Sequence, residues 1–209
     1  MHWIDPAQLP LIKGTIERFT VNGQGELDGL LLDLGDGGFK LVHFPSHMAD
    51  DVSALLKPGA TVGVRGLKPR GADVIAAVAL ECADGVEIID RGPSNHATGK
   101  SRPVTQMPMS AAGTVRLTLF TPKGKVRGVL LDNGTIVRMT LKQAEQIKER
   151  LRPGAHIQIQ GTGCDTPHGR VIDVHHLATP AGSFDVVSKS HAPRSAALDP
   201  ATRGPANAR

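Results

Sequence analysis

Aromatic side chains are scarce in this chain of 209 residues. It has no Tyr, one Trp and five Phe, so that aromatic residues make up only 3% of the sequence. Proteins that bind single-stranded nucleic acid usually stack bases on aromatic side chains, and each stacked base contributes roughly 1–3 kcal/mol. We therefore expect any binding of nucleic acid to be weak and directed to the backbone. The same scarcity disfavours an oligosaccharide or small-molecule site.

The sequence also has few cysteines and no long apolar run. Cys82 and Cys164 are the only cysteines, and neither belongs to a Cys-x-x-Cys pair, which argues against a disulfide framework and a cysteine zinc site. We expect both to be buried thiols in a reducing cytoplasm. No apolar run approaches the roughly 20 residues that a membrane helix needs, and the N-terminus lacks the pattern of an export signal. These features predict a cytoplasmic protein that does not enter a membrane.

Catalytic and metal-binding motifs are lacking as well. His43 and His47 are four residues apart, but Pro45 lies between them and breaks the helical geometry that could bring them to one metal ion. His175 and His176 are adjacent, so in a strand they point to opposite faces. The glycine-rich segments lack the residues of a phosphate loop, and no Gly-x-Ser-x-Gly elbow occurs. The sequence predicts a binding protein rather than an enzyme, with no catalytic residue, metal or cofactor.

An internal repeat is the strongest feature that is present. The glycines, the Pro-Gly pairs and the apolar positions keep one order in the two halves of the chain. The segment from Gly25 to Asp33 returns as Gly124 to Asp132, and the segment from Leu56 to Gly66 returns as Leu151 to Gly161. The sequence therefore predicts two copies of one small unit.

Each copy predicts five short strands with one helix between the third and the fourth. In the first copy the strands span 12–21, 27–34, 39–44, 61–66 and 73–82, and the helix spans 46–56 with Ser46 as a candidate N-cap. In the second copy the strands span 114–120, 126–132, 135–139, 156–161 and 171–177. Its helix begins at Thr140, which forms a capping-box pattern with Gln143.

This order of elements resembles the oligonucleotide/oligosaccharide-binding (OB) fold, and the pair of units resembles uncharacterised bacterial proteins with tandem OB folds of the nucleic-acid-binding type. The predicted class is all-β with one short helix per unit, in two tandem five-stranded OB-type barrels. A small SH3-like barrel is the competing interpretation, but it would not place a three-turn helix at that point. We expect the first barrel at 12–88, a flexible linker at 89–112, the second barrel at 113–185 and a disordered tail at 186–209.

The net charge of +4 is unevenly distributed. The first barrel has seven Lys and Arg against eleven Asp and Glu, whereas the second has ten against six. In an OB barrel, strands two and three and the loop after strand one form the usual ligand surface. The second barrel places basic residues there, which would neutralise phosphates of a nucleic-acid backbone. The candidate binding residues are Arg116, Lys123, Lys125, Arg127 and Arg138. The last four lie in a loop or near a strand end, where we expect their side chains to reach solvent.

Two functions remain open from the sequence. The first is weak, backbone-directed binding of nucleic acid through the second barrel, with single-stranded DNA or RNA as the partner. The alternative is a protein-interaction module in which the acidic and basic barrels recognise each other or a protein partner. Phe120, near Lys123, is a candidate stacking platform, although core packing also accounts for it. A shared fold cannot decide between these functions.

Overall fold

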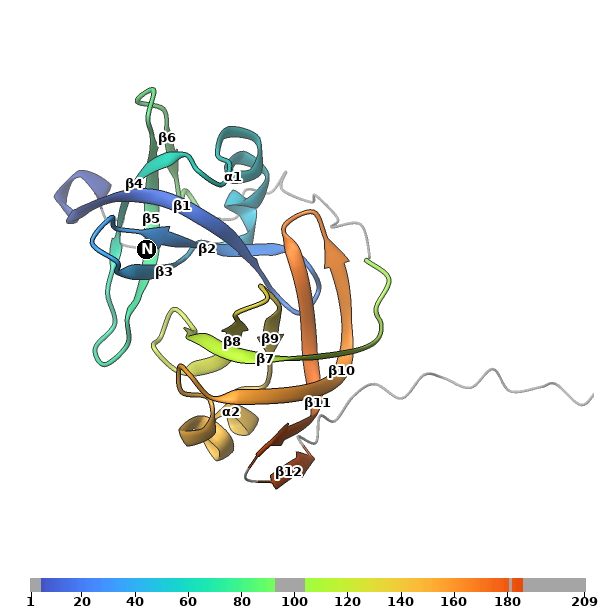
Figure 1. Cartoon of the computed structure of the whole chain (residues 1–209). Coiled ribbons are helices and arrows are strands. Elements are labelled where there is room, and N and C mark those ends of the chain that lie inside the picture. The colour runs from blue at the N-terminus through green and yellow to red at the C-terminus, as the bar shows by residue number, and fades with distance from the viewer. Residues whose placement is uncertain (1–4, 93–103, 181, 186–209) are drawn as a thin grey trace, which may run out of the picture.

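The structure is a computed structural model that describes residues 5–92, 104–180 and 182–185. Seventeen helical and strand elements follow one another in two similar series (Figure 1). The first series contains the 3-10 turns Pro6–Gln8 and Ser46–Met48, helix α1 (Ala49–Leu55), and strands β1 (Leu11–Val21), β2 (Leu27–Asp33), β3 (Phe39–His43), β4 (Thr61–Leu67), β5 (Val74–Cys82) and β6 (Glu87–Ile89). The second contains the 3-10 turn Lys148–Arg150, helix α2 (Leu141–Ile147), and strands β7 (Met107–Phe120), β8 (Val126–Leu131), β9 (Ile136–Arg138), β10 (His156–Thr166), β11 (Gly169–Thr179) and β12 (Gly182–Asp185).

Both series close into a barrel with the same topology. In the first, β1 pairs with β2 and β4, β2 pairs with β3, and β5 joins β4 antiparallel and β3 parallel. In the second, β7, β8, β9, β11 and β10 make the corresponding pairings. Each helix lies between the third and fourth strands of its barrel. The predicted tandem of two five-stranded OB barrels is confirmed, with β6 and β12 as short additional strands.

Local sequence signals correctly predict where helix α2 begins but not where the first helical segment begins. Thr140 and Gln143 form the predicted capping box, in which the Thr140 hydroxyl accepts from the Gln143 backbone N–H and the Gln143 side chain accepts from the Thr140 backbone N–H. Ser46 was predicted to be the N-cap of the first helix, but it does not have that role. A 3-10 turn starts at Ser46 itself after Pro45, and no side-chain cap is made there. Cys82 and Cys164 are free and buried, as predicted.

The boundary of the second barrel differs from the expected one. Strand β7 begins at Met107 rather than near Gly113, because its first residues pair with the far part of β10, where Met107 lies opposite Gly163. The predicted linker 89–112 is thus shortened from its C-terminal side, and residues 93–103 lie outside the described part of the chain. The predicted tail 186–209 also lies outside it.

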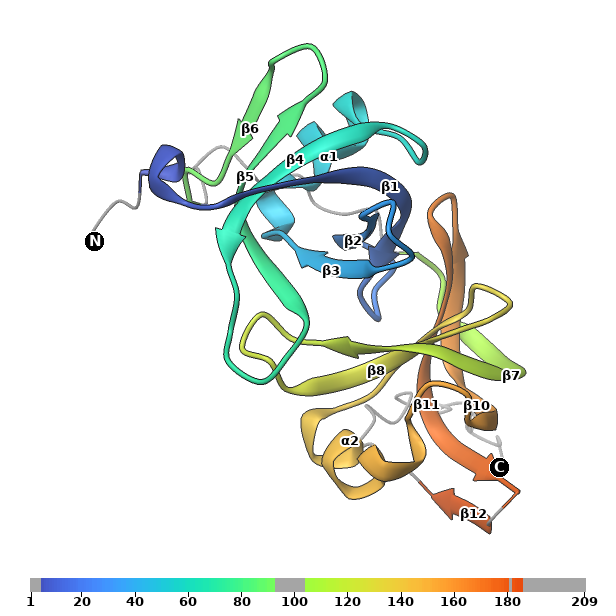
Figure 2. The ribbon, with the colours of Figure 1, turned by 60° about the vertical axis from the view of Figure 1, so that its left-hand side comes forward.

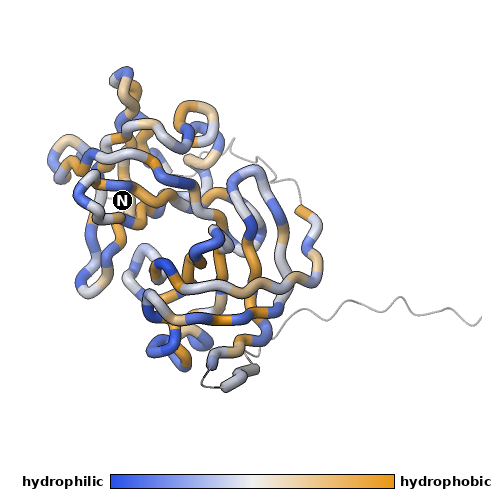
Figure 3. The backbone as a smooth tube through the Cα atoms, in the orientation of Figure 1, coloured by the Kyte–Doolittle hydropathy of each residue, from blue (hydrophilic) through white to orange (hydrophobic). Residues whose placement is uncertain are grey.

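The two barrels pack directly against each other (Figures 1 and 2). The interior of the second barrel forms one apolar cluster, which includes Val129 and Leu131. Leu130, which lies between them on β8, instead joins the apolar cluster of the first barrel. Successive side chains of a strand point to opposite faces, so β8 is buried on both sides. Strand β2 is buried in the same way, since Leu30, Leu31 and Leu32 are all at most 1% exposed. Hydrophobic segments follow these strands, whereas the loops are mostly hydrophilic (Figure 3).

Each barrel contacts the other through the same position of the repeat, so that the contacts occur in matching pairs. The β7–β8 turn at Gly124 packs against Pro69 and Ala72 of the β4–β5 loop. The equivalent turn of the first barrel, at Gly25, packs against Cys164 and Thr166 at the end of β10, next to the corresponding β10–β11 loop of the second. This reciprocity is the mark of an isologous contact with approximate two-fold symmetry. The barrels therefore form the equivalent of a homodimer within one chain, in which the β1–β2–β3 surface of the first barrel and the β7–β8–β9 surface of the second face each other.

Candidate nucleic-acid interface

Arg138 is not at the surface, and the expectation that its side chain reaches solvent is wrong. It is 2% exposed, because the outer side of β9 is covered by the first barrel. Its Nε and Nη2 donate to the Val21 carbonyl oxygen at 2.9 and 2.6 Å. Nη2 also lies 2.8 and 2.9 Å from the two carboxylate oxygens of Asp28. Burial lowers the pKa of the Arg138 guanidinium, and the Asp28 carboxylate opposes that shift. Arg138 is thus a structural residue of the contact between the barrels.

The equivalent position of the first barrel makes the equivalent contact. His43 lies opposite Gly29 in the register, as Arg138 lies opposite Gly128. The His43 Nδ1 is 2.9 Å from the Asp28 carbonyl oxygen, and its Nε2 contacts the Phe120 carbonyl oxygen. The His43 side chain is therefore also committed to the contact between the barrels.

Arg116 is also engaged across the interface. Both of its terminal nitrogens bond to the Glu17 carboxylate, with Nη2 at 2.8 Å from Oε2. Its guanidinium carbon lies 4.9 Å from the centre of the Phe39 ring, which is within the range of a cation–π contact. A bidentate pair of this kind holds both side chains in one geometry. Arg116 is therefore not free to neutralise a phosphate unless that pair opens.

Lys123, Lys125 and Arg127 remain exposed, at the β7–β8 turn and the start of β8. Within the described part of the chain, none of the three forms an ion pair or a side-chain hydrogen bond. The turn that carries them lies beside the β4–β5 loop of the first barrel (Figure 2), where Arg70 is exposed too. We call Arg70, Lys123, Lys125 and Arg127 the basic ridge. Three predicted site residues thus gather with a fourth that sequence reasoning missed, because Arg70 belongs to the acidic barrel.

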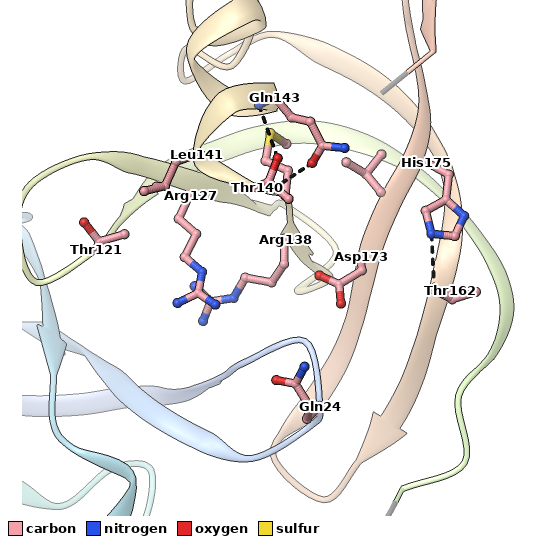
Figure 4. A pocket seen from close by; sticks show the side chains of 12 residues that line it. Gln24, Thr121, Arg127, Arg138, Thr140, Leu141, Gln143, Thr162, Asp173 and His175 are labelled. Carbon is pink, nitrogen blue, oxygen red and sulfur yellow. Dashed lines mark hydrogen bonds between the residues drawn. The ribbon is translucent and has the colours of Figure 1, made fainter. Parts of the chain in front are cut away.

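A pocket opens next to this ridge, between the two barrels. Its volume is about 630 Å³, which is within the common range of roughly 300–1,000 Å³ for ligand sites. Figure 4 shows Arg127 and Arg138 next to each other on its wall, with Asp173 close by and Gln24 reaching in from the β1–β2 loop. Thr162 and His175 complete the side formed by β10 and β11, where Thr162 Oγ1 and His175 Nε2 are 3.4 Å apart. Arg127 thus belongs to both the basic ridge and the pocket.

The Asp173 carboxylate is partly buried in the pocket, which costs free energy because its charge loses contact with water. Its carboxylate lies against Gly23 of the first barrel, where an added Cβ would be 2.2 Å from Oδ2. Burial raises the pKa of Asp173 above its usual value, although Arg127, Arg138 and His175 act in the opposite direction. Sequence reasoning did not identify Asp173 as a site residue, because Asp173 and Gly23 come together only through the packing of the barrels. An acid whose pKa is shifted by its surroundings in a cleft is a candidate for a functional residue.

The raised pKa of Asp173 predicts how replacing this residue with a neutral one affects stability. Above the ordinary Asp pKa, the folded protein retains a proton that the unfolded chain has lost, so stability falls as pH rises through the raised pKa. We expect Asp173→Asn to increase the melting temperature at neutral pH, and this gain to vanish near pH ~3, where both states are protonated. The matched control is Asp165→Asn on β10, where Arg170 lowers the pKa of the carboxyl and no gain is expected. Thermal unfolding at several pH values measures both, and a neutral-pH loss in Asp173→Asn contradicts the prediction.

The described residues contain no helix that is long and apolar enough to cross a bilayer. Nor do they contain a group of three or more His, Cys, Asp and Glu side chains that could hold a metal ion.

Comparison with known protein families gives no match, and comparison with curated proteins gives none. Solved structures do resemble the chain. The wild-type single-stranded DNA binding protein of Thermus aquaticus is 18% identical, with 95% of this chain and 94% of that chain covered and a TM-score of 0.27. A deletion mutant of the same protein is 16% identical, with 88% and 96% covered and a TM-score of 0.25. Similarity at this level does not support the transfer of binding residues, and the topology alone identifies the chain as a tandem OB-fold protein.

Proposed function

We propose that this chain is a non-enzymatic binding protein that binds single-stranded nucleic acid weakly, through the phosphate backbone. The observation that carries the proposal is the basic ridge, in which four exposed cationic residues lie on two adjoining segments, the β7–β8 turn with the start of β8 and the β4–β5 loop. OB folds bind oligonucleotides with the loops after strand one and between strands four and five, in addition to the strand face. The ridge combines the first kind of loop from the second barrel with the second kind from the first barrel.

The covered strand faces support a loop-directed mode of binding. The outer side of β8 and β9, which would be the usual OB ligand surface, is occupied by the first barrel at Leu130 and Ile136. None of the four Phe residues whose side chains are described is exposed, and Phe120 is partly buried against the shared apolar cluster. Because none of these described Phe rings is exposed for stacking, the binding free energy comes mainly from phosphate neutralisation, which is independent of sequence and sensitive to salt.

The test is a charge reversal of the three ridge residues of the second barrel, Lys123→Glu, Lys125→Glu and Arg127→Glu together. Each lost phosphate contact removes roughly 0.7 from the slope of log K against log salt, and the reversed charge then repels the strand. We expect the variant to lose measurable binding of a fluorescent single-stranded oligonucleotide in an anisotropy titration repeated at several salt concentrations. Because all three side chains are exposed, the fold should tolerate the change.

The matched control reverses three exposed cations outside the basic ridge, Lys13→Glu and Lys57→Glu in the first barrel and Arg91→Glu just after it, and so changes the net charge equally. This control should retain most of the binding, since general electrostatic attraction falls off over about 10 Å at 0.1 M salt. Equal losses in both variants would show that net charge, rather than the basic ridge, controls binding. If the unmodified protein shows no salt-dependent binding at low salt, the proposal is wrong and a protein-interaction module takes its place.

A further inference from the structure

The pocket between the barrels is chemically different from the basic ridge that leads into it. The ridge presents only cations, whereas the pocket places a carboxylate, Asp173, close to the guanidinium groups of Arg127 and Arg138 (Figure 4). A site for phosphate alone would gain nothing from that carboxylate, because like charges repel. The pocket is therefore suited to a group that offers hydrogen-bond donors to Asp173 while its attached phosphate lies toward Arg127.

Two polar groups of residues that line the pocket lack a hydrogen-bond partner among the residues that the structure describes. The Asp173 carboxylate accepts no hydrogen bond from the residues that the structure describes. The Nη1 of Arg138 is buried and has no hydrogen-bond partner, although the other nitrogens of that side chain are fully engaged. Buried polar groups are nearly always paired, and each exception calls for an explanation such as a functional role. Burying the charge of Asp173 also lowers the stability of the protein, and residues that lower stability are typical of functional sites.

We propose that this pocket receives one unstacked nucleobase of the bound strand, and that Asp173 accepts hydrogen bonds from the exocyclic amino group of that base. The proposal rests on the proposed function, because the strand reaches the pocket along the basic ridge through Arg127. Carboxylates recognise cytosine by accepting from its N4 amino group. Uracil has a carbonyl oxygen at that position, which would face the carboxylate acceptor to acceptor. The pocket therefore favours cytosine over uracil, two bases of nearly equal size.

The test compares oligodeoxycytidine with oligodeoxyuridine of equal length on the full chain, at neutral pH and constant salt. We expect the unmodified protein to bind the cytidine strand about tenfold more tightly, because hydrogen bonds to charged groups are among the stronger hydrogen bonds in proteins. Asp173→Asn should reduce this ratio to about one, since an amide can turn either its oxygen or its NH₂ toward the base. Asp165→Asn, in the exposed Asp165–Arg170 pair on the neighbouring strands, should keep the full ratio.

The outcomes separate this inference from the proposed function. Equal affinity for both strands in the unmodified protein, or an unchanged ratio in Asp173→Asn, overturns the nucleobase pocket and leaves the basic ridge in place. Failure of the protein to bind either strand overturns the proposed function instead. If deoxycytidine monophosphate alone binds as tightly as the strand, the pocket is a site for free nucleotides and the inference of a strand-borne base is wrong.

Discussion

Replacing Asp28 with Ala should lower the free energy of unfolding by about 3–5 kcal/mol, the usual cost of removing one partner from a buried ion pair. Asp28 is the carboxylate that faces the Arg138 guanidinium, whose side chain is 2% exposed. Without it, Arg138 stays buried between the barrels with only the Val21 carbonyl oxygen as a strong partner. The substitution also removes the acceptor of the Thr20 hydroxyl. Denaturant unfolding followed by circular dichroism measures the loss.

Two further variants show whether the unpaired charge of Arg138 causes the loss of stability in Asp28→Ala. Asp51→Ala removes an exposed carboxylate of α1 and should change stability by about 0.5 kcal/mol or less. The double variant Asp28→Leu with Arg138→Met removes both charges and should recover most of the lost stability, because apolar replacements of buried ion pairs are often neutral or stabilising. A loss below about 1 kcal/mol in Asp28→Ala would mean that Arg138 does not depend on this carboxylate.

Arg138 also shows where sequence reasoning failed. Its position at the end of a predicted strand suggested an exposed side chain, for which charge reversal costs about 0.5 kcal/mol. In the structure, a glutamate at this position would place a second carboxylate against Asp28 in the interface. The error arose because each copy was treated as a separate barrel. The outer side of β9 is buried by residues from the other half of the chain, and no local pattern around Arg138 indicates that.

The fold of each barrel was predictable for the opposite reason. Strand order, the single helix, the capping box at Thr140 and the turn glycines are all determined by neighbouring residues, and the repeat supplied each signal twice. A signal for the packing of the barrels was present too. The runs Leu30-Leu31-Leu32 and Val129-Leu130-Leu131 lack the alternation of a strand with one exposed face, and continuous apolar runs indicate burial on both faces. That signal shows that β2 and β8 are covered, but not by what.

The candidate site was only partly predictable. Lys123, Lys125 and Arg127 are close in sequence, on a turn whose exposure follows from its glycine and lysines. Arg70 and Asp173 come to the site from distant segments, and their placement depends on the approximate two-fold packing of the barrels. The uneven charge of the two halves has a physical use in this packing, since the Glu17–Arg116 and Asp28–Arg138 pairs each join an acidic residue of the first barrel to a basic residue of the second.

Leu130→Ala should lower the free energy of unfolding by about 2–5 kcal/mol, although Leu130 lies outside the interior of its own barrel. It is 1% exposed and packs in the apolar cluster of the first barrel, so the truncation leaves a cavity between the barrels. The matched control is Leu55→Ala in α1, where the side chain is 50% exposed and little apolar contact is lost. Thermal unfolding by calorimetry measures both variants and also shows whether the barrels unfold together.

The same measurement distinguishes a packed pair from two barrels on a flexible linker. In a packed pair, the unmodified chain unfolds in one transition, because the cluster that contains Leu130 belongs to both barrels. In a freely linked pair, Leu130 would be a solvent-exposed leucine on the outer side of β8, and its truncation would change stability no more than Leu55→Ala does. Two separate transitions, with neither shifted by Leu130→Ala, would contradict the interface. They would also return the outer side of β8 and β9 to its usual role as the ligand surface of an OB barrel.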